Sequence, residues 1–343
     1  MKRTLTVVLV LMIAAFISCE EKGPETTCLY GENIPKETLE SIVGQANPII
    51  ISVVEQDFGK IYETGSENLK AAQNRDQFAL ALKLFVRTFG KIDYPMLKEA
   101  YYMDSKSDEE RIYIPCNLGK EGVTDLWGMP ANQELAALIY HARTDTEFVR
   151  VVVQLEKEQE EWKLRSLSVH PMTIKHRKYE YYGRRAAELR EKNMLHAAAL
   201  YYKTAILLSD VGLNVNEFTV RALQEQMAQI KVDYMPAGEI QIWNVSPDRS
   251  YKVYNVDTAY DDKKLLVQVS YMARNFEDKN RLEKQAREIA IFLATKFPEY
   301  RDAFDGIRVT AASEKQEEMM SSYHSTILFS ELPEVPAADG HDK

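Results

Sequence analysis

The spacing of hydrophobic side chains changes period several times along the chain, and each change predicts a different kind of element. Between residues 47 and 102, apolar side chains recur at intervals of three and four, as at Phe78 and Leu82, which is the spacing of an amphipathic helix. Asn47-Pro48 and Ser66 are typical helix starts. We therefore expect three helices in this region, at residues 47–62, 66–89 and 94–102.

From residue 111 the apolar side chains follow a two-residue period, which is typical of strands. We expect strands at residues 111–116, 135–143, 148–156 and 162–170. The third of these is rich in valine, and its two faces carry Phe148, Arg150, Val152 and Gln154 on one side and Val149, Val151, Val153 and Leu155 on the other.

The second half of the chain repeats this change of period. Residues 179–231 are rich in Ala, Leu, Arg and Glu, which predicts helices. Beyond Met235-Pro236-Ala237-Gly238 the pattern predicts strands at 239–244, 251–257 and 264–274, a helix at 278–296, and strands at 307–312 and 321–329.

Together these elements predict an α+β fold with six segments. We expect a signal peptide at residues 1–18, a flexible tether at 19–46, a helix-plus-antiparallel-sheet domain at 47–172, a helical hairpin segment at 173–235, a small α+β domain at 238–332 and a disordered tail at 333–343.

The first twenty residues predict the cellular location of the protein. Lys2 and Arg3 precede an uncharged apolar run that is too short to span a membrane, and Cys19 follows it directly. This pattern resembles a bacterial lipoprotein signal, although Phe16 stands where that family prefers leucine. The resemblance implies acylation of Cys19 and attachment to the cell envelope, at the outer membrane, on its periplasmic or surface face. The alternative is an ordinary secretory signal with an incidental cysteine.

Two segments of the first predicted domain resemble NTF2-like proteins. They are Gly90-Lys91-Ile92-Asp93-Tyr94-Pro95-Met96-Leu97 and the strand that begins Glu161-Trp162-Lys163-Leu164. The resemblance implies a curved sheet that wraps a helix and leaves a pocket. If the face with Arg150 and Gln154 lines that pocket, these two side chains are candidates for binding a polar ligand. The alternative is that both are solvated.

The middle segment resembles a single tetratricopeptide repeat. The resemblance depends on the spacing of Tyr182, Arg185, Ala186, Leu189, Ala198, Tyr202 and Ala205, while Asp210 departs from the usual terminal proline. Such a hairpin implies close helix packing at the alanines. Its tyrosines, Tyr179 and Tyr201 among them, are candidates for binding a partner protein or, alternatively, for packing.

Charge and cysteine content limit the partners. The chain of 343 residues has a net charge of −9, which argues against nucleic acid, since phosphate binding needs clustered Lys and Arg. Cys28 and Cys116 remain after Cys19 is assigned, and they form either a disulfide, as an oxidising compartment allows, or two free thiols.

The sequence contains no nucleotide-binding, hydrolase or zinc-protease motif, and its six histidines are scattered. We therefore expect no catalytic residues, no metal and no cofactor. The sequence favours a lipid-anchored, non-catalytic binding or scaffolding module for another envelope protein. The alternative is a small-molecule binder or enzyme that uses the NTF2-like pocket.

Overall fold

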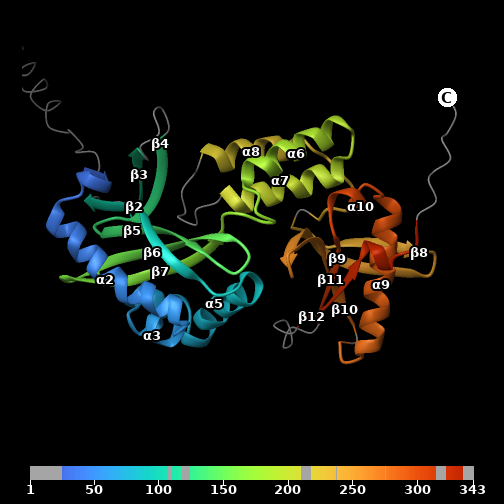
Figure 1. The fold of residues 1–343 in the computed structure, drawn as a ribbon, viewed down its shortest axis with the longest axis horizontal. Helices are drawn as coiled ribbons and strands as arrows, with labels where there is room; N and C mark the ends of the chain where they lie inside the picture. The colour runs from blue at the N-terminus through green and yellow to red at the C-terminus, as the bar shows by residue number, and fades with distance from the viewer. Residues whose placement is uncertain are drawn as a thin grey trace, which may run out of the picture.

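The computed structural model of the chain describes residues 25–106, 110–117, 124–209, 218–236, 238–274, 276–313 and 322–334. The predicted signal peptide, Cys19 and most of the predicted tail lie outside these residues. The described chain combines helices with sheets that are mostly antiparallel, as expected of an α+β protein. Figure 1 shows one sheet at each end of the molecule, with three helices between them.

The first sheet has the strand order β1, β2, β5, β6, β7, and every neighbouring pair is antiparallel. Its strands are β1 (Glu25–Tyr30), β2 (Asp93–Lys106), β5 (Glu134–Arg143), β6 (Phe148–Glu158) and β7 (Glu161–Pro171). The helical elements between β1 and β2 are the 3-10 turn η1 (Gly31–Asn33), α2 (Lys36–Glu55), α3 (Phe58–Glu63), α4 (Glu67–Ala72) and α5 (Arg75–Phe89).

Strand β6 has the two faces that its alternating sequence predicts. Val149, Val151 and Val153 are fully buried in a core with apolar side chains of α2, α3 and α5. Val152, on the other face, packs with a separate hairpin formed by β3 (Arg111–Asn117) and β4 (Thr124–Pro130). A disulfide between Cys28 in β1 and Cys116 in β3 joins this hairpin to the edge of the sheet.

The prediction of a helix at 94–102 was wrong, because these residues belong to the long strand β2. This segment is rich in residues that favour helix, namely Met, Leu, Lys, Glu and Ala. In the structure, however, β2 pairs with β1 on one side and with β5 on the other. The ladder hydrogen bonds of two neighbours outweigh a helix preference of a few tenths of a kcal/mol per residue, about the usual size of that preference.

The predicted helix start at Asn47-Pro48 was also wrong, because α2 begins eleven residues earlier and Pro48 lies inside it. A proline inside a helix removes one backbone hydrogen bond and crowds the carbonyl four residues before it. The residue at that position is Gly44, and α2 continues through both residues to Glu55. Residues 25–46 therefore form a strand and a helix of the first sheet unit, and not a flexible tether.

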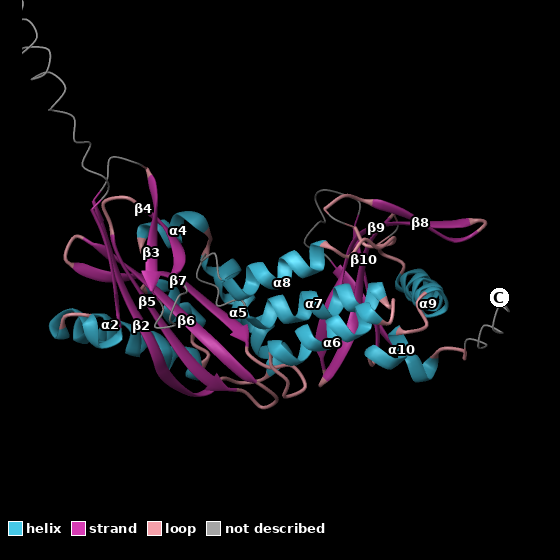
Figure 2. Ribbon diagram, turned by 90° about the horizontal axis from the view of Figure 1, so that it is seen from above, coloured by secondary structure: helices cyan, strands magenta, loops and turns pink. Residues whose placement is uncertain are grey.

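The middle of the chain forms three helices, α6 (Tyr179–Glu191), α7 (Leu195–Ser209) and α8 (Phe218–Ala228). Helices α6 and α7 are joined by a tight turn at Lys192 and Asn193, as the sequence predicts. Ala186, Ala198 and Ala205 are completely buried in the core that these helices share. Figure 2 shows all three helices lying between the two sheets.

The second sheet has the strand order β12, β11, β10, β9, β8. Its elements are β8 (Gln241–Ser246), β9 (Arg249–Asp261), β10 (Lys264–Ala273), α9 (Lys279–Lys296), α10 (Tyr300–Ala303), β11 (Gly306–Ser313), β12 (Ser322–Leu328) and the 3-10 turn η3 (Phe329–Glu331). Strands β10 and β11 are parallel and are connected through α9, while the other pairs are antiparallel. One hydrophobic core includes residues of this sheet, of α9 and of the middle helices.

Candidate anion-binding site

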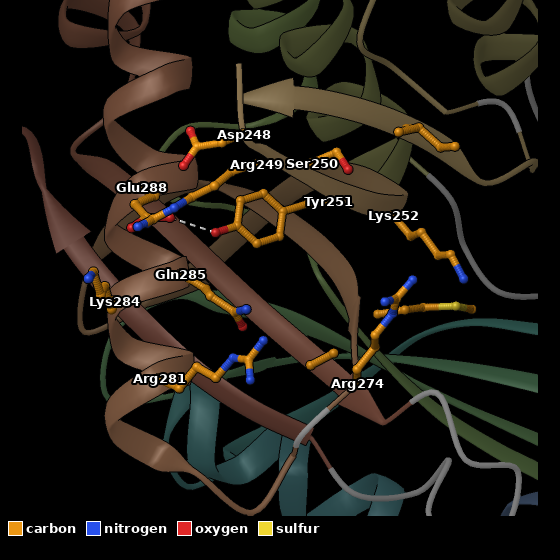
Figure 3. Close-up of a pocket in the computed structure, with 13 residues that line it drawn as sticks. Asp248, Arg249, Ser250, Tyr251, Lys252, Arg274, Arg281, Lys284, Gln285 and Glu288 are labelled. Carbon is orange, nitrogen blue, oxygen red and sulfur yellow. Dashed lines mark hydrogen bonds and ion pairs between the residues drawn. The ribbon is translucent and has the colours of Figure 1, made fainter. Parts of the chain in front are cut away.

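A cavity of about 580 Å³ lies between α9, the first residues of β9 and the end of β10. Its volume falls within the range of roughly 300–1,000 Å³ that is usual for ligand sites. Figure 3 shows side chains of α9 on one side of this cavity and those of β9 and β10 on the other. We take this cavity as the candidate site because its lining is rich in charged side chains.

The sequence of α9 explains why polar side chains reach the cavity. Asp278 caps the helix by accepting a hydrogen bond from the Arg281 backbone N–H at 3.0 Å. The apolar stripe of α9 is then buried against the sheet, with Leu282, Ile289 and Leu293 at most 1% exposed. Arg281, Lys284, Gln285 and Glu288 recur at intervals of three and four on a neighbouring stripe, so they line the cavity together.

The cavity is cationic although the protein is acidic. Its lining contains five basic residues, Arg249, Lys252, Arg274, Arg281 and Lys284. Only two acidic residues, Asp248 and Glu288, line it with them. Clustered cations on low-dielectric walls concentrate their field in the cavity, which attracts anions. The net charge of −9 for the whole chain therefore hides a local charge of the opposite sign.

Arg249, Tyr251 and Glu288 form an internally paired part of the lining. Glu288 forms an ion pair with Arg249, and its carboxylate also accepts a hydrogen bond from the Tyr251 hydroxyl at 2.6 Å. Burial raises the pKa of Tyr251, although Arg249 opposes this shift. Among the described residues, no carboxylate forms an ion pair with Arg281 or Lys284. These two cations are exposed and are the groups most available to a ligand.

The chemistry of this lining suits an anion with several oxygens. An arginine guanidinium presents a planar set of N–H donors that matches carboxylate and phosphate oxygens, while lysine adds a mobile point charge. Gln285 accepts a hydrogen bond from the Tyr271 hydroxyl at 3.0 Å, which fixes its amide at the wall of the cavity. The described residues contain no group of three or more His, Cys, Asp and Glu side chains that could hold a metal ion.

A second cavity of about 630 Å³ continues from the first along α9. Asp248, Arg249 and Glu288 line both cavities, so the two are adjacent. The rest of the second lining consists of three apolar residues, Val245, Ile291 and Phe292, and three polar ones, Ser246, Thr295 and Lys296. Ile291 is 37% exposed.

The structure places the ligand candidates Arg150 and Gln154 away from this site. Both lie on the face of β6 that is opposite to the helices, since the helices cover Val149 and Val151. The helices therefore do not cover the face that carries Arg150 and Gln154, and a role of these side chains in binding a polar ligand stays a prediction. Both side chains are half-buried on the face that also carries the β3–β4 hairpin.

The two partner candidates have different surroundings. Tyr201 is only 6% exposed, and its hydroxyl donates a hydrogen bond to the Ala303 carbonyl at 2.7 Å. Its ring also contacts Phe304, with 5.4 Å between ring centroids. The surface role expected of Tyr201 was wrong, because the second sheet unit already covers it. Tyr179 is half-buried, and its role in binding stays a prediction.

Little in the amino-acid sequence indicates the cationic cavity. Its basic residues come from two separate segments, 249–252 and 274–284, and neither is a dense run of Lys and Arg. The only signal was that α9 carries Arg281 and Lys284 on one polar stripe, which is also the pattern of an ordinary solvated helix face. The fold supplies the remaining information by bringing the two segments together.

Comparison with known proteins provides no family for this chain. No protein-family model matches the sequence, and no curated protein matches it either. Within the part of the chain that the structure describes, no helix is both long enough and apolar enough to cross a membrane.

Proposed function

We propose that this protein is a lipid-anchored binding protein of the bacterial cell envelope, and that its second sheet unit binds an anionic ligand in the cavity beside α9. The observation that carries the binding role is the lining of that cavity, in which five basic side chains meet two acidic ones. A protein of net charge −9 would gain nothing for its own stability by gathering like charges in one place. A ligand that brings negative charge to Arg281 and Lys284, which form no ion pair among the described residues, explains the arrangement.

The proposed anchor is Cys19, for the reasons given by the sequence. Its acyl chains would hold the protein at the membrane, since two chains give stable attachment where one does not. Incorporation of labelled fatty acid tests this anchor, and a Cys19→Ala variant that is labelled as well as the parent would contradict it. We propose another envelope protein as a second partner, with Tyr179 as its candidate contact.

The finer fold assignments are part of the same proposal. An antiparallel sheet with α2, α3 and α5 on one face supports the NTF2-like assignment of residues 47–172. The helix-covered face is filled by apolar side chains, which favours a non-catalytic role for this unit. The buried Ala186, Ala198 and Ala205 support the repeat-like assignment of the middle hairpin.

Calorimetric titration with inorganic phosphate and with citrate tests the binding role. The protein would be the mature chain with Cys19→Ser, so that neither acyl chains nor detergent compete. We expect binding that weakens as salt is raised, because the interaction is electrostatic. The double variant Arg281→Gln, Lys284→Gln should bind at least tenfold more weakly.

Lys279→Gln is the matched control, because Lys279 is exposed on the same helix and does not line the cavity. It should bind both anions as the parent does. Absence of binding to either anion, or equal binding by the parent and the double variant, would contradict the proposed site.

A further inference from the structure

The outer edge of β8 is the least protected edge of the two five-stranded sheets. Among the described residues β8 pairs with β9 alone, and it stands last in the strand order of its sheet. Figure 2 shows the hairpin of β8 and β9 at the margin of the molecule. An unpaired edge presents a row of backbone N–H and C=O groups, to which another strand can add unless something prevents it.

The other outer strands of these sheets are protected in ways that are common in proteins. β7 carries Glu161, Lys163 and Arg165, and charges of this kind oppose the addition of a strand. The Leu164 backbone is also already hydrogen-bonded to the segment 64–66. β1 and β12, in their described residues, expose no large hydrophobic side chain.

β8 has no such protection. Its sequence, Gln-Ile-Trp-Asn-Val-Ser, contains neither a charge nor a proline. Ile242 is 67% exposed, and Ile240, which directly precedes the strand, is 51% exposed. Trp243 points the other way, is 1% exposed and packs against Phe292 of α9. Residues two apart in an extended chain lie on the same face, so Ile240 and Ile242 form an exposed apolar pair beside the unpaired edge.

Charge favours a second copy of the chain as the occupant of this edge. Two copies of a chain with a net charge of −9 repel each other on average, but no charged residue lies between Glu239 and Asp248. Antiparallel pairing brings the Glu239 end of one β8 toward the Ser246 end of the other, where Lys296 of α9 lines the second cavity together with Val245 and Ser246. Parallel pairing would instead bring the two Glu239 ends together.

We infer that two copies of the chain pair through β8 in antiparallel orientation, so that their five-stranded sheets join into one continuous sheet. A twofold axis at Gln241 places Ile240 of each copy opposite Ile242 of the other, and the four isoleucines then meet on one face. An axis at Ile242 would place Ile240 opposite the polar Asn244. The register centred on Gln241 is therefore the one that buries both exposed isoleucines against apolar neighbours.

Sedimentation equilibrium of the mature Cys19→Ser chain tests the inference. We expect a reversible equilibrium between monomer and dimer at micromolar concentrations. Ile242→Lys places a charge at the unpaired edge and should weaken dimerisation at least tenfold, with an unchanged circular dichroism spectrum, because this side chain is largely exposed. Leu80→Lys is the matched control, since Leu80 is 47% exposed on α5 of the first sheet unit. It should dimerise as the parent does.

A parent that stays monomeric at about 100 µM would overturn the inference. The same holds if Ile242→Lys dimerises as well as the parent, or if Leu80→Lys weakens the dimer equally.

Cysteine cross-linking tests the register. Gln241→Cys should give disulfide-linked dimers under mild oxidation, because the two copies of residue 241 lie directly opposite each other. Asn244→Cys should not, since its two copies lie six residues apart along the paired strands, which corresponds to about 20 Å. Cys28 and Cys116 are joined in a disulfide and do not compete. Any result in which Gln241→Cys does not cross-link more readily than Asn244→Cys overturns the inferred pairing.

Discussion

Two buried tyrosines show how much depends on a single hydrogen bond. Tyr140 lies in the core of the first sheet unit, only 4% exposed, and its hydroxyl has no hydrogen-bond partner among the described residues. Burial raises the pKa of Tyr140 to about 12. Tyr182, 1% exposed, instead donates a hydrogen bond to the Ile174 carbonyl at 2.7 Å. The same side chain is thus satisfied in one core and unsatisfied in the other.

Removal of the two hydroxyls should have opposite effects on stability. An unsatisfied buried hydroxyl costs about 1–3 kcal/mol, so Tyr140→Phe should leave the free energy of unfolding unchanged or raise it by about 1 kcal/mol. Tyr182→Phe should lower it by about 1 kcal/mol, because a buried hydrogen bond is lost, although the Ile174 carbonyl still accepts one from the Arg177 backbone N–H. Urea unfolding of both variants checks this. A clear loss of stability in Tyr140→Phe would mean that its hydroxyl has a partner.

At the scale of elements, the α6–α7 hairpin is held together by small side chains. Ala186 of α6 and Ala198 and Ala205 of α7 are all 0% exposed in one shared core. Small residues at such positions let two helix backbones approach closely, and the large rings of Tyr182 and Tyr202 occupy the neighbouring space.

Enlarging these alanines should destabilise the hairpin. Ala198→Leu or Ala205→Leu should lower the free energy of unfolding by about 1–3 kcal/mol, because the packed core has no room for a branched side chain. Arg184→Ala, an exposed change on α6, should stay within about 0.5 kcal/mol of the parent. A change of Lys203 on α7 would not be a neutral control, because its side chain donates a hydrogen bond to the Val256 carbonyl at 2.5 Å. Unchanged urea midpoints for both leucine variants would refute the close packing.

The local pattern of apolar and polar residues predicted the elements that depend on near neighbours in sequence. It missed those that depend on pairing between distant segments. Helix α9 covers nearly all of the predicted range 278–296, and α6 and α7 lie within the predicted helical segment 179–231, since both are decided by neighbours in sequence. Strand β1 was taken for tether and part of β2 for helix, because their structure depends on pairing between residues about 75 apart. The candidate site was missed in the same way, since its cations meet only after β9, β10 and α9 have packed.

At the scale of the whole molecule, one buried carboxylate joins the two sheet units. Glu147 lies in the turn between β5 and β6 and is 3% exposed. It accepts hydrogen bonds from the Tyr260 hydroxyl of β9 at 2.6 Å, from the Thr173 hydroxyl at 2.7 Å and from the His176 backbone N–H at 3.1 Å. Phe89 of α5 stacks on Tyr260, with 5.5 Å between ring centroids.

Loss of this carboxylate should uncouple the two units. Glu147→Ala removes the acceptor of all three hydrogen bonds. We expect this loss to lower the free energy of unfolding by about 3 kcal/mol. Glu147→Gln retains one carbonyl oxygen and the side-chain volume and should cost less. Because the bond to Tyr260 joins the two units, we expect the thermal transition of Glu147→Ala to broaden or divide in two by calorimetry, as domains that have lost their interface unfold independently.

Tyr260→Phe removes only this bond and keeps the stacking on Phe89, so it should broaden the transition in the same way but less than Glu147→Ala does. If Glu147→Ala melts in one transition at the temperature of the parent, the carboxylate does not couple the units, and the contacts of the middle helices must hold the molecule together.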